Sequence, residues 1–161
     1  MSEVEKKRWV FRAHVVDRAG ALTSIASAFS NEGISIDTVV GHGFEERARV
    51  DGSVVLTFYC TECDKETMVR KVRRLSKVTD LAEHPYDSQS LRKSAVVLVT
   101  RRLAPRDVAG KEAFLTCELV NKGPGGWTYF LAGSPSELEP VLNRLEAAGL
   151  VKDIVYSVLG L

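Results

Sequence analysis

The chain has 161 residues, with 22 Lys and Arg against 21 Asp and Glu, for a formal net charge of +1 at pH 7. Hydrophobic residues make up 45% and charged residues 27%, as in an ordinary globular protein, and the length allows one mid-sized domain or two small ones. A charge this close to zero excludes a broad, long-range attraction to nucleic acid or to an anionic membrane, and we expect neither as a partner.

The sequence shows no sign of a membrane or secretory segment. No apolar run approaches the roughly 18 residues of a membrane-spanning helix, and Arg12 and His14 interrupt the apolar stretch after the charged start. Three cysteines cannot build a disulfide framework. We therefore expect a cytoplasmic protein with reduced thiols.

The first half of the chain has the order β-α-β-β-α-β. Trp9, Phe11, Ala13 and Val15 fall on one face at period two, which predicts a strand over 9–16. The apolar spacing from Leu22 to Phe29, through Ile25 and Ala26, predicts an amphipathic helix that ends before Gly33. The remaining elements are strands over 34–40 and 53–60, a helix over 65–76 with Asp64 as its N-cap, and a short strand over 78–83.

The second half repeats this pattern in shortened form. Ser134 and Glu137 form a capping box that predicts the start of a helix, and strands are predicted over 95–100, 113–120, 127–132 and 151–159. The first strands of the two halves are offset by about 85 residues and the closing helices by 70. Because residues 103–112 carry no apolar stripe, the second copy is predicted to lack its first helix, which leaves β-β-β-α-β.

The segment from Asp17 to Leu22 is the strongest candidate for a binding site. It lies where a strand leads into the N-terminus of a helix, and unpaired backbone N–H groups at such a place bind small anions such as a carboxylate. Gly20 allows close approach to the backbone, and Asp17, Ser35 or Asp37 could bind an ammonium group. A zwitterionic amino acid fits these charges. The same residues are also consistent with a simple helix cap and turn.

The segment Val16-Asp17-Arg18-Ala19-Gly20-Ala21-Leu22, followed by Asn31-Glu32-Gly33-Ile34-Ser35-Ile36, resembles an ACT domain. The length, the tandem arrangement and the tail from Val151 to Leu161 are similar to the regulatory (small) subunit family of acetolactate synthase. The resemblance implies an α+β fold of tandem ferredoxin-like ACT domains with antiparallel sheets. The expected domains are 8–84, with the effector site, and 94–161, a truncated ACT-like domain, joined by a linker over 85–93.

What the resemblance implies for function is regulation without catalysis. Such subunits dimerise through their ACT domains, bind a branched-chain amino acid, usually valine, and regulate a thiamine-diphosphate-dependent catalytic large subunit; no cofactor of their own is expected. The effector-binding residues implied here are Asp17, Ala19, Gly20, Ala21, Leu22, Ser35 and Ile36. The family usually carries Asn where this chain has Asp17 and Ser35, so the effector is left open.

Two other functions remain as alternatives. One is a free-standing ACT-domain sensor that acts on another enzyme or on transcription. The other is a small redox or metal protein that uses Cys60 and Cys63, whose C-x-x-C spacing lacks the two further ligands that zinc needs. Residues 53–60 contain Phe58 and Tyr59, but these point to opposite faces, and RNA binding is a minor alternative.

Overall fold

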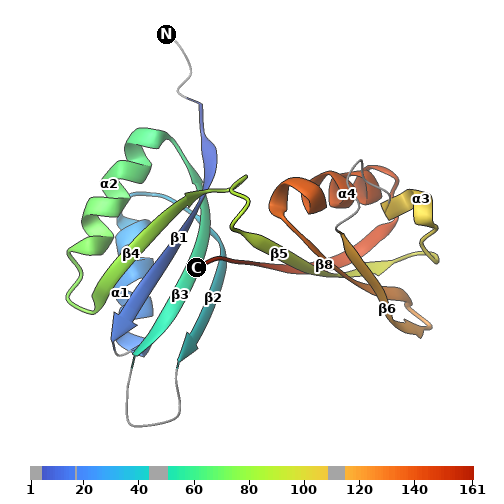
Figure 1. The fold of residues 1–161 in the computed structure, drawn as a ribbon, viewed down its shortest axis with the longest axis horizontal. Helices are drawn as coiled ribbons and strands as arrows, with labels where there is room; N and C mark the ends of the chain where they lie inside the picture. Colours follow the sequence, from blue (N-terminus) through green and yellow to red (C-terminus); the bar gives the residue numbers. More distant parts are fainter. Residues whose placement is uncertain (1–4, 17, 44–50, 109–114) are drawn as a thin grey trace. The chain divides into compact units, whose positions relative to one another are not determined.

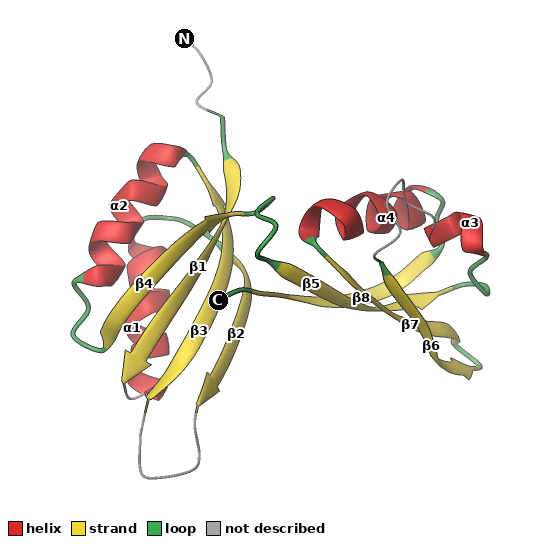
Figure 2. Ribbon diagram, viewed as in Figure 1, coloured by secondary structure: helices red, strands yellow, loops and turns green. Residues whose placement is uncertain are grey.

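The computed structural model describes residues 5–16, 18–43, 51–108 and 115–161. They form two four-stranded antiparallel sheets, each with helices against one face (Figures 1 and 2). The chain divides into two compact units, a first unit that runs to Tyr86 and a second unit from Asp87 to Leu159. The expected α+β, ferredoxin-like fold is confirmed.

The first unit has the predicted order β-α-β-β-α-β, and its sheet has the strand order β2-β3-β1-β4. One face of this sheet is covered by both helices (Figure 1). Its elements are β1 (Lys7–Val16), α1 (Arg18–Asn31), β2 (Ile36–Gly43), β3 (Asp51–Cys60), α2 (Glu62–Arg73) and β4 (Val78–Pro85).

Three phenylalanines form the centre of the first core. Phe58 packs edge-to-face against Phe11 and Phe29, with ring centroids 4.7 and 4.8 Å away. The helix α1 contributes Phe29 together with Ala21 and Ile25, all fully buried. The predicted stripe is therefore wrong at two of its four positions: Leu22 is 38% exposed and Ala26 is exposed as well, because α1 is rotated so that Ala21 faces the sheet instead.

The helix α2 begins three residues earlier than predicted. Its N-cap is Thr61, whose side-chain oxygen accepts a hydrogen bond from the backbone N–H of Asp64 at 3.1 Å. Asp64, the predicted N-cap, instead lies in the first turn of α2, where its carboxylate accepts a hydrogen bond from the Thr61 hydroxyl. At this place the positive end of the helix dipole stabilises its negative charge.

The second unit has the sheet order β6-β7-β5-β8, with the long helix α4 against one face. The expectation of no first helix needs one correction: a single helical turn, α3, follows β5. Residues 109–114, which include the first two residues of the predicted strand 113–120, lie outside the described segments. The elements are β5 (Arg92–Val99), α3 (Pro105–Val108), β6 (Thr116–Gly123), β7 (Gly126–Gly133), α4 (Pro135–Ala147) and β8 (Val151–Leu159).

Two backbone features show which positions of the two units correspond. The pairing of β1 with β4 is irregular just before Val15, and the pairing of β5 with β8 is irregular just before Val99, 84 residues later. The helix N-caps Thr61 and Ser134 are 73 residues apart. These offsets replace the predicted 85 and 70, so the second unit is shorter by 11 residues between its first strand and its long helix.

A lysine, a carboxylate and an aromatic ring meet in each core, on different elements. In the first unit, Lys65 of α2 is 2.8 Å from Glu83 and its ammonium lies 4.8 Å from the ring centroid of Trp9. In the second unit, Lys93 of β5 pairs with Glu139 at 2.5 Å and lies 4.2 Å from the ring centroid of Tyr156. With the 84-residue offset between β1 and β5, Lys93 of the second unit stands at the position that corresponds to Trp9 of the first.

We expect Gly126→Ala to destabilise the second unit by about 2–4 kcal/mol. Gly126 has a φ of +136°, and a Cβ there would lie 2.3 Å from the carbonyl oxygen of Val99, a backbone atom that cannot move aside. The measurement is urea unfolding of the full chain followed by circular dichroism. Gly125→Ala is the matched control, because a Cβ at Gly125 meets no atom within 4 Å. Equal midpoints for the two variants would contradict the strain argument.

Candidate functional site

The start of α1 is the centre of the candidate site. β1 ends at Val16, whose N–H donates to the carbonyl of Lys77 at 2.9 Å, and α1 begins at Arg18. The first four N–H groups of an α-helix have no partner within the helix, and together with the helix dipole they favour an anion. Of the predicted residues, Asp17 lies outside the described segments, and for Ala19 only the helical backbone is described.

The described side of this first turn is partly apolar. Gly20 is half-buried, and its carbonyl accepts a hydrogen bond from the Ser24 hydroxyl at 3.0 Å. Ala21 is buried against the sheet, whereas Leu22 is exposed on the surface of the helix. The structure therefore places the exposed branched aliphatic side chain of Leu22 one turn after Arg18, next to the turn whose N–H groups have no partner within the helix.

Ser35 and Ile36 lie at the opposite end of the sheet from this turn. Ile36 and Trp9 are both opposite Phe58, so the start of β2 is level with the start of β1. Val15, at the end of β1, is opposite Gly52. Seven residues of β-strand span about 23 Å, so that within one chain Ser35 and Ile36 do not meet Gly20, Ala21 and Leu22.

β2 forms one edge of the first sheet. It pairs with β3 on one side, and among the described residues no strand lies on its other side. The strand contains no proline, and Val39 in its middle is 45% exposed. Such an edge offers unpaired backbone groups to another strand. The sequence analysis did not identify this edge, because the composition of a strand does not give its place in the sheet.

Cys60 and Cys63 differ in their surroundings. Cys60 is buried, its thiol donates to the carbonyl of Thr61 at 3.2 Å, and burial raises its pKa to about 11. Cys63 is exposed near the start of α2. Within the described segments no group of three or more His, Cys, Asp or Glu residues is arranged to hold a metal ion. A thiol with a raised pKa is a poor nucleophile at neutral pH.

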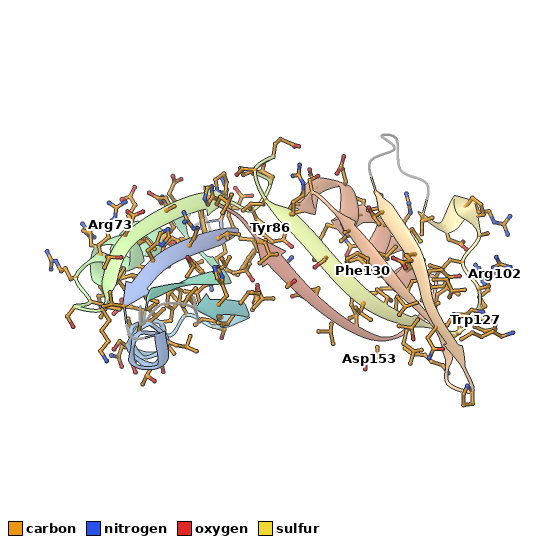
Figure 3. All side chains as sticks on the ribbon, turned by 60° about the horizontal axis from the view of Figure 1, so that its bottom comes forward. Arg73, Tyr86, Arg102, Trp127, Phe130 and Asp153 are labelled. Atoms are coloured by element: carbon orange, nitrogen blue, oxygen red, sulfur yellow. The ribbon has the colours of Figure 1, made fainter. Side chains whose placement is uncertain are left out.

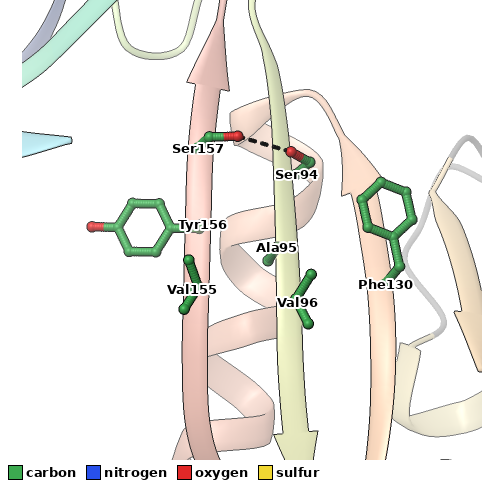
Figure 4. Close-up of a pocket in the computed structure, with 7 residues that line it drawn as sticks. All are labelled: Ser94, Ala95, Val96, Phe130, Val155, Tyr156 and Ser157. Atoms are coloured by element: carbon green, nitrogen blue, oxygen red, sulfur yellow. Dashed lines mark hydrogen bonds between the residues drawn. The ribbon is translucent and has the colours of Figure 1, made fainter. Parts of the chain in front are cut away.

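The open face of the second sheet has a shallow hollow of about 150 Å³ (Figure 4). The hydroxyl groups of Ser94 and Ser157 in its lining are 3.0 Å apart and hydrogen-bond to each other. The hollow offers no charged group to a zwitterion, which makes it a poorer candidate than the turn at the start of α1. The lining residues are Ser94, Ala95, Val96, Phe130, Val155, Tyr156 and Ser157.

Two β-α-β-β-α-β units, the second with a one-turn first helix, define a tandem ACT-type fold. The chain is similar over 96% of its length, and of the other chain's, to the crystal structure of the acetolactate synthase small subunit from Thermotoga maritima, with 14% identity and a TM-score of 0.67. The regulatory subunit of aspartate kinase from Thermus thermophilus is 14% identical over 91% of this chain and 93% of its own, with a TM-score of 0.48.

The first of these similarities confirms, at the level of the fold, the resemblance that the sequence indicated. A TM-score below 0.5 is too low for the second to establish a common fold. No protein-family model matches the chain, and no curated protein matches it. Among the described helices, none is both long and apolar enough to cross a membrane.

We expect iodoacetamide to alkylate Cys63 well before Cys60 in the folded full chain at pH 8. Cys63 is exposed, whereas the Cys60 thiol is buried and its raised pKa leaves little thiolate at that pH. Mass spectrometry of tryptic peptides after timed quenching measures both rates, and unfolding in urea should equalise them. Alkylation of Cys60 as fast as that of Cys63 in the folded chain would instead support a reactive thiol pair.

Proposed function

We propose that this chain is a non-catalytic regulatory protein that binds a small branched-chain amino acid, valine-like in size, and regulates a partner enzyme. The partner proposed is the catalytic large subunit of acetolactate synthase. The observation that carries the proposal is the turn at the start of α1, where helix N–H groups lie beside the exposed Leu22. The full-length fold similarity to an acetolactate synthase small subunit supports the choice of partner.

The chemistry of the turn suits an amino acid. The N–H groups of the first turn of α1 would receive the ligand carboxylate, because the helix dipole and the unpaired donors both favour a negative charge. Gly20 carries no side chain that would block that approach. Leu22 would contact the aliphatic side chain of the ligand, and burial of a branched aliphatic group against it favours valine, leucine or isoleucine over polar amino acids.

The other half of the proposed site would come from a second copy of the chain. Two β2 strands that pair antiparallel about a two-fold axis bring the start of one strand beside the end of the other. Ser35 and Ile36 of one copy would then lie near the turn that follows β1 in its partner, although they are far from it in their own chain. The seven residues predicted from the sequence thus form one site only across such a pair.

This arrangement explains how binding would be communicated. An amino acid held between two copies stabilises the arrangement of the pair that completes the site. A catalytic subunit with different affinities for the two arrangements is then regulated by the ligand through linkage. The sign of the regulation depends on which arrangement the catalytic subunit binds more tightly.

We expect isothermal titration calorimetry to detect binding of valine, leucine or isoleucine, and we expect Gly20→Val to lower the affinity at least about tenfold, equivalent to about 1.4 kcal/mol. The added side chain would stand beside the N–H groups that receive the carboxylate. Ser27→Val is the control, because Ser27 is exposed on the same helix two turns further along. Absence of heat from every proteinogenic amino acid would refute the proposal.

We expect Val39→Lys to weaken self-association and ligand binding together. Val39 lies in the middle of β2, so a two-fold pairing would place the two introduced ammonium groups close to each other. Sedimentation velocity would show a shift from dimer towards monomer. Val155→Lys, at a position 71% exposed on the second sheet, should leave both properties unchanged. A monomeric variant that binds the amino acid with undiminished affinity would exclude a shared site.

A further inference from the structure

We propose that the second unit supplies its own carboxylate to the loop that corresponds to the proposed effector loop, so that each chain binds one amino acid and binds it only in the first unit. The carboxylate belongs to Asp107. The part about Asp107 rests on the geometry of the second unit. The part about the number of amino acids bound per chain rests on the proposed function.

The two loops begin at equivalent positions. In the first unit the N–H of Val16 donates to the carbonyl of Lys77, and in the second the N–H of Thr100 donates to the carbonyl of Leu150, both at 2.9 Å. Each of these bonds closes the end of a central strand onto the residue before the last strand. The segment after Thr100 therefore corresponds to the segment after Val16, which leads into α1.

In the second unit two backbone donors of this segment are already occupied by side chains. The N–H of Ala104 donates to the Asp107 carboxylate at 2.7 Å, and the Arg101 guanidinium donates to both oxygens of that carboxylate at 2.8 and 3.2 Å. The N–H of Leu103 donates to the hydroxyl of Tyr129 at 3.1 Å. A carboxylate bound by one backbone N–H and by both terminal nitrogens of a guanidinium has the contacts that the carboxylate of a free amino acid would make.

The charge of this carboxylate is strongly favoured. Hydrogen bonds from Arg101 and from the Ala104 N–H hold the pKa of Asp107 at about 2, and the nearby Arg106 acts in the same direction. Arg102 lies in the same loop, at the end of the second sheet that carries Trp127, the second residue of β7 (Figure 3). Asp107 is therefore ionised throughout the physiological pH range and remains a partner for these donors.

The local sequence explains why the loop closes on itself. Between Thr100 and Val108 there is no glycine, and Pro105 provides no N–H, in contrast to Gly20 in the first turn of α1. Asp107 lies three residues after Ala104, the spacing at which a side chain returns to the backbone of the preceding turn. With only one turn of helix, the second unit also lacks the long dipole of α1.

The first arm of the test does not depend on any effector. Asp107→Ala should lower the melting temperature of the full chain, and 200 mM sodium acetate should raise the melting temperature of this variant by about 2–4 °C relative to sodium chloride at equal ionic strength. Acetate should not stabilise the wild type in this way, because its carboxylate site is filled. Asp153→Ala is the control, since the Asp153 carboxylate belongs to β8 and accepts its hydrogen bond from the adjacent Ile154 N–H.

A second variant covers the case in which Asp107→Ala does not fold. Asp107→Asn keeps an oxygen for the Ala104 N–H but loses the charge that Arg101 and Arg106 face. Because the folded pKa of Asp107 lies below its unfolded value, the stability advantage of the wild type over this variant should be complete above about pH 4. It should disappear as the pH falls to about 2. An advantage that does not change with pH would overturn the role of the charge.

The second arm measures stoichiometry by calorimetry. The wild type and Asp107→Asn should bind one branched-chain amino acid per chain. Because Gly20→Val weakens the site in the first unit, its titration should show no remaining binding from a site in the second unit. Absence of acetate rescue, or two sites per wild-type chain, would overturn the inference. Acetate rescue without amino-acid binding in any variant would refute the proposed function while supporting the built-in carboxylate, so the two failures are distinguishable.

Discussion

The pairing of β1 and β2 with the same strand, β3, is the constraint on which the site depends. Both strands run antiparallel to β3 and are therefore parallel to each other, with Trp9 and Ile36 level at one end of the sheet. The turn into α1 follows the other end of β1. A site that uses both ends must draw them from two chains, and the exposed edge of β2 is where a second chain can pair.

The two units show how one fold accommodates an open loop and a closed one. In the first unit the chain passes from β1 into a 14-residue helix, whose first N–H groups have no partner within the helix. In the second unit the corresponding segment forms a single turn, and the N–H groups of Leu103 and Ala104 just before it donate to Tyr129 and Asp107. The loss of 11 residues therefore shortens the helix to one turn and, on the inference above, converts a candidate binding loop into a structural one.

The two buried lysines make the same kinds of contact in both units, although they stand at positions that do not correspond in the repeat. Lys65 and Lys93 come from a helix and a strand respectively, and each is paired with a carboxylate and covers an aromatic ring. A buried ammonium must keep a charged partner to offset the cost of leaving water. The same three kinds of side chain at different positions keep that balance, whereas replacement of the carboxylate alone would remove the charged partner of the buried ammonium.

The sequence by itself determined the order of elements and the location of the candidate turn, because alternation in residues 9–16 and the helical spacing up to Phe29 depend only on local geometry. It also indicated that the second unit lacks its first helix, of which the structure retains the single turn α3. The rotation that buries Ala21 and exposes Leu22 was decided by packing against Phe11 and Phe58, which come from other strands. The strand order and the position of β2 at an edge of the first sheet were likewise decided only in three dimensions, because they depend on pairing between strands far apart in the chain, which no local pattern encodes.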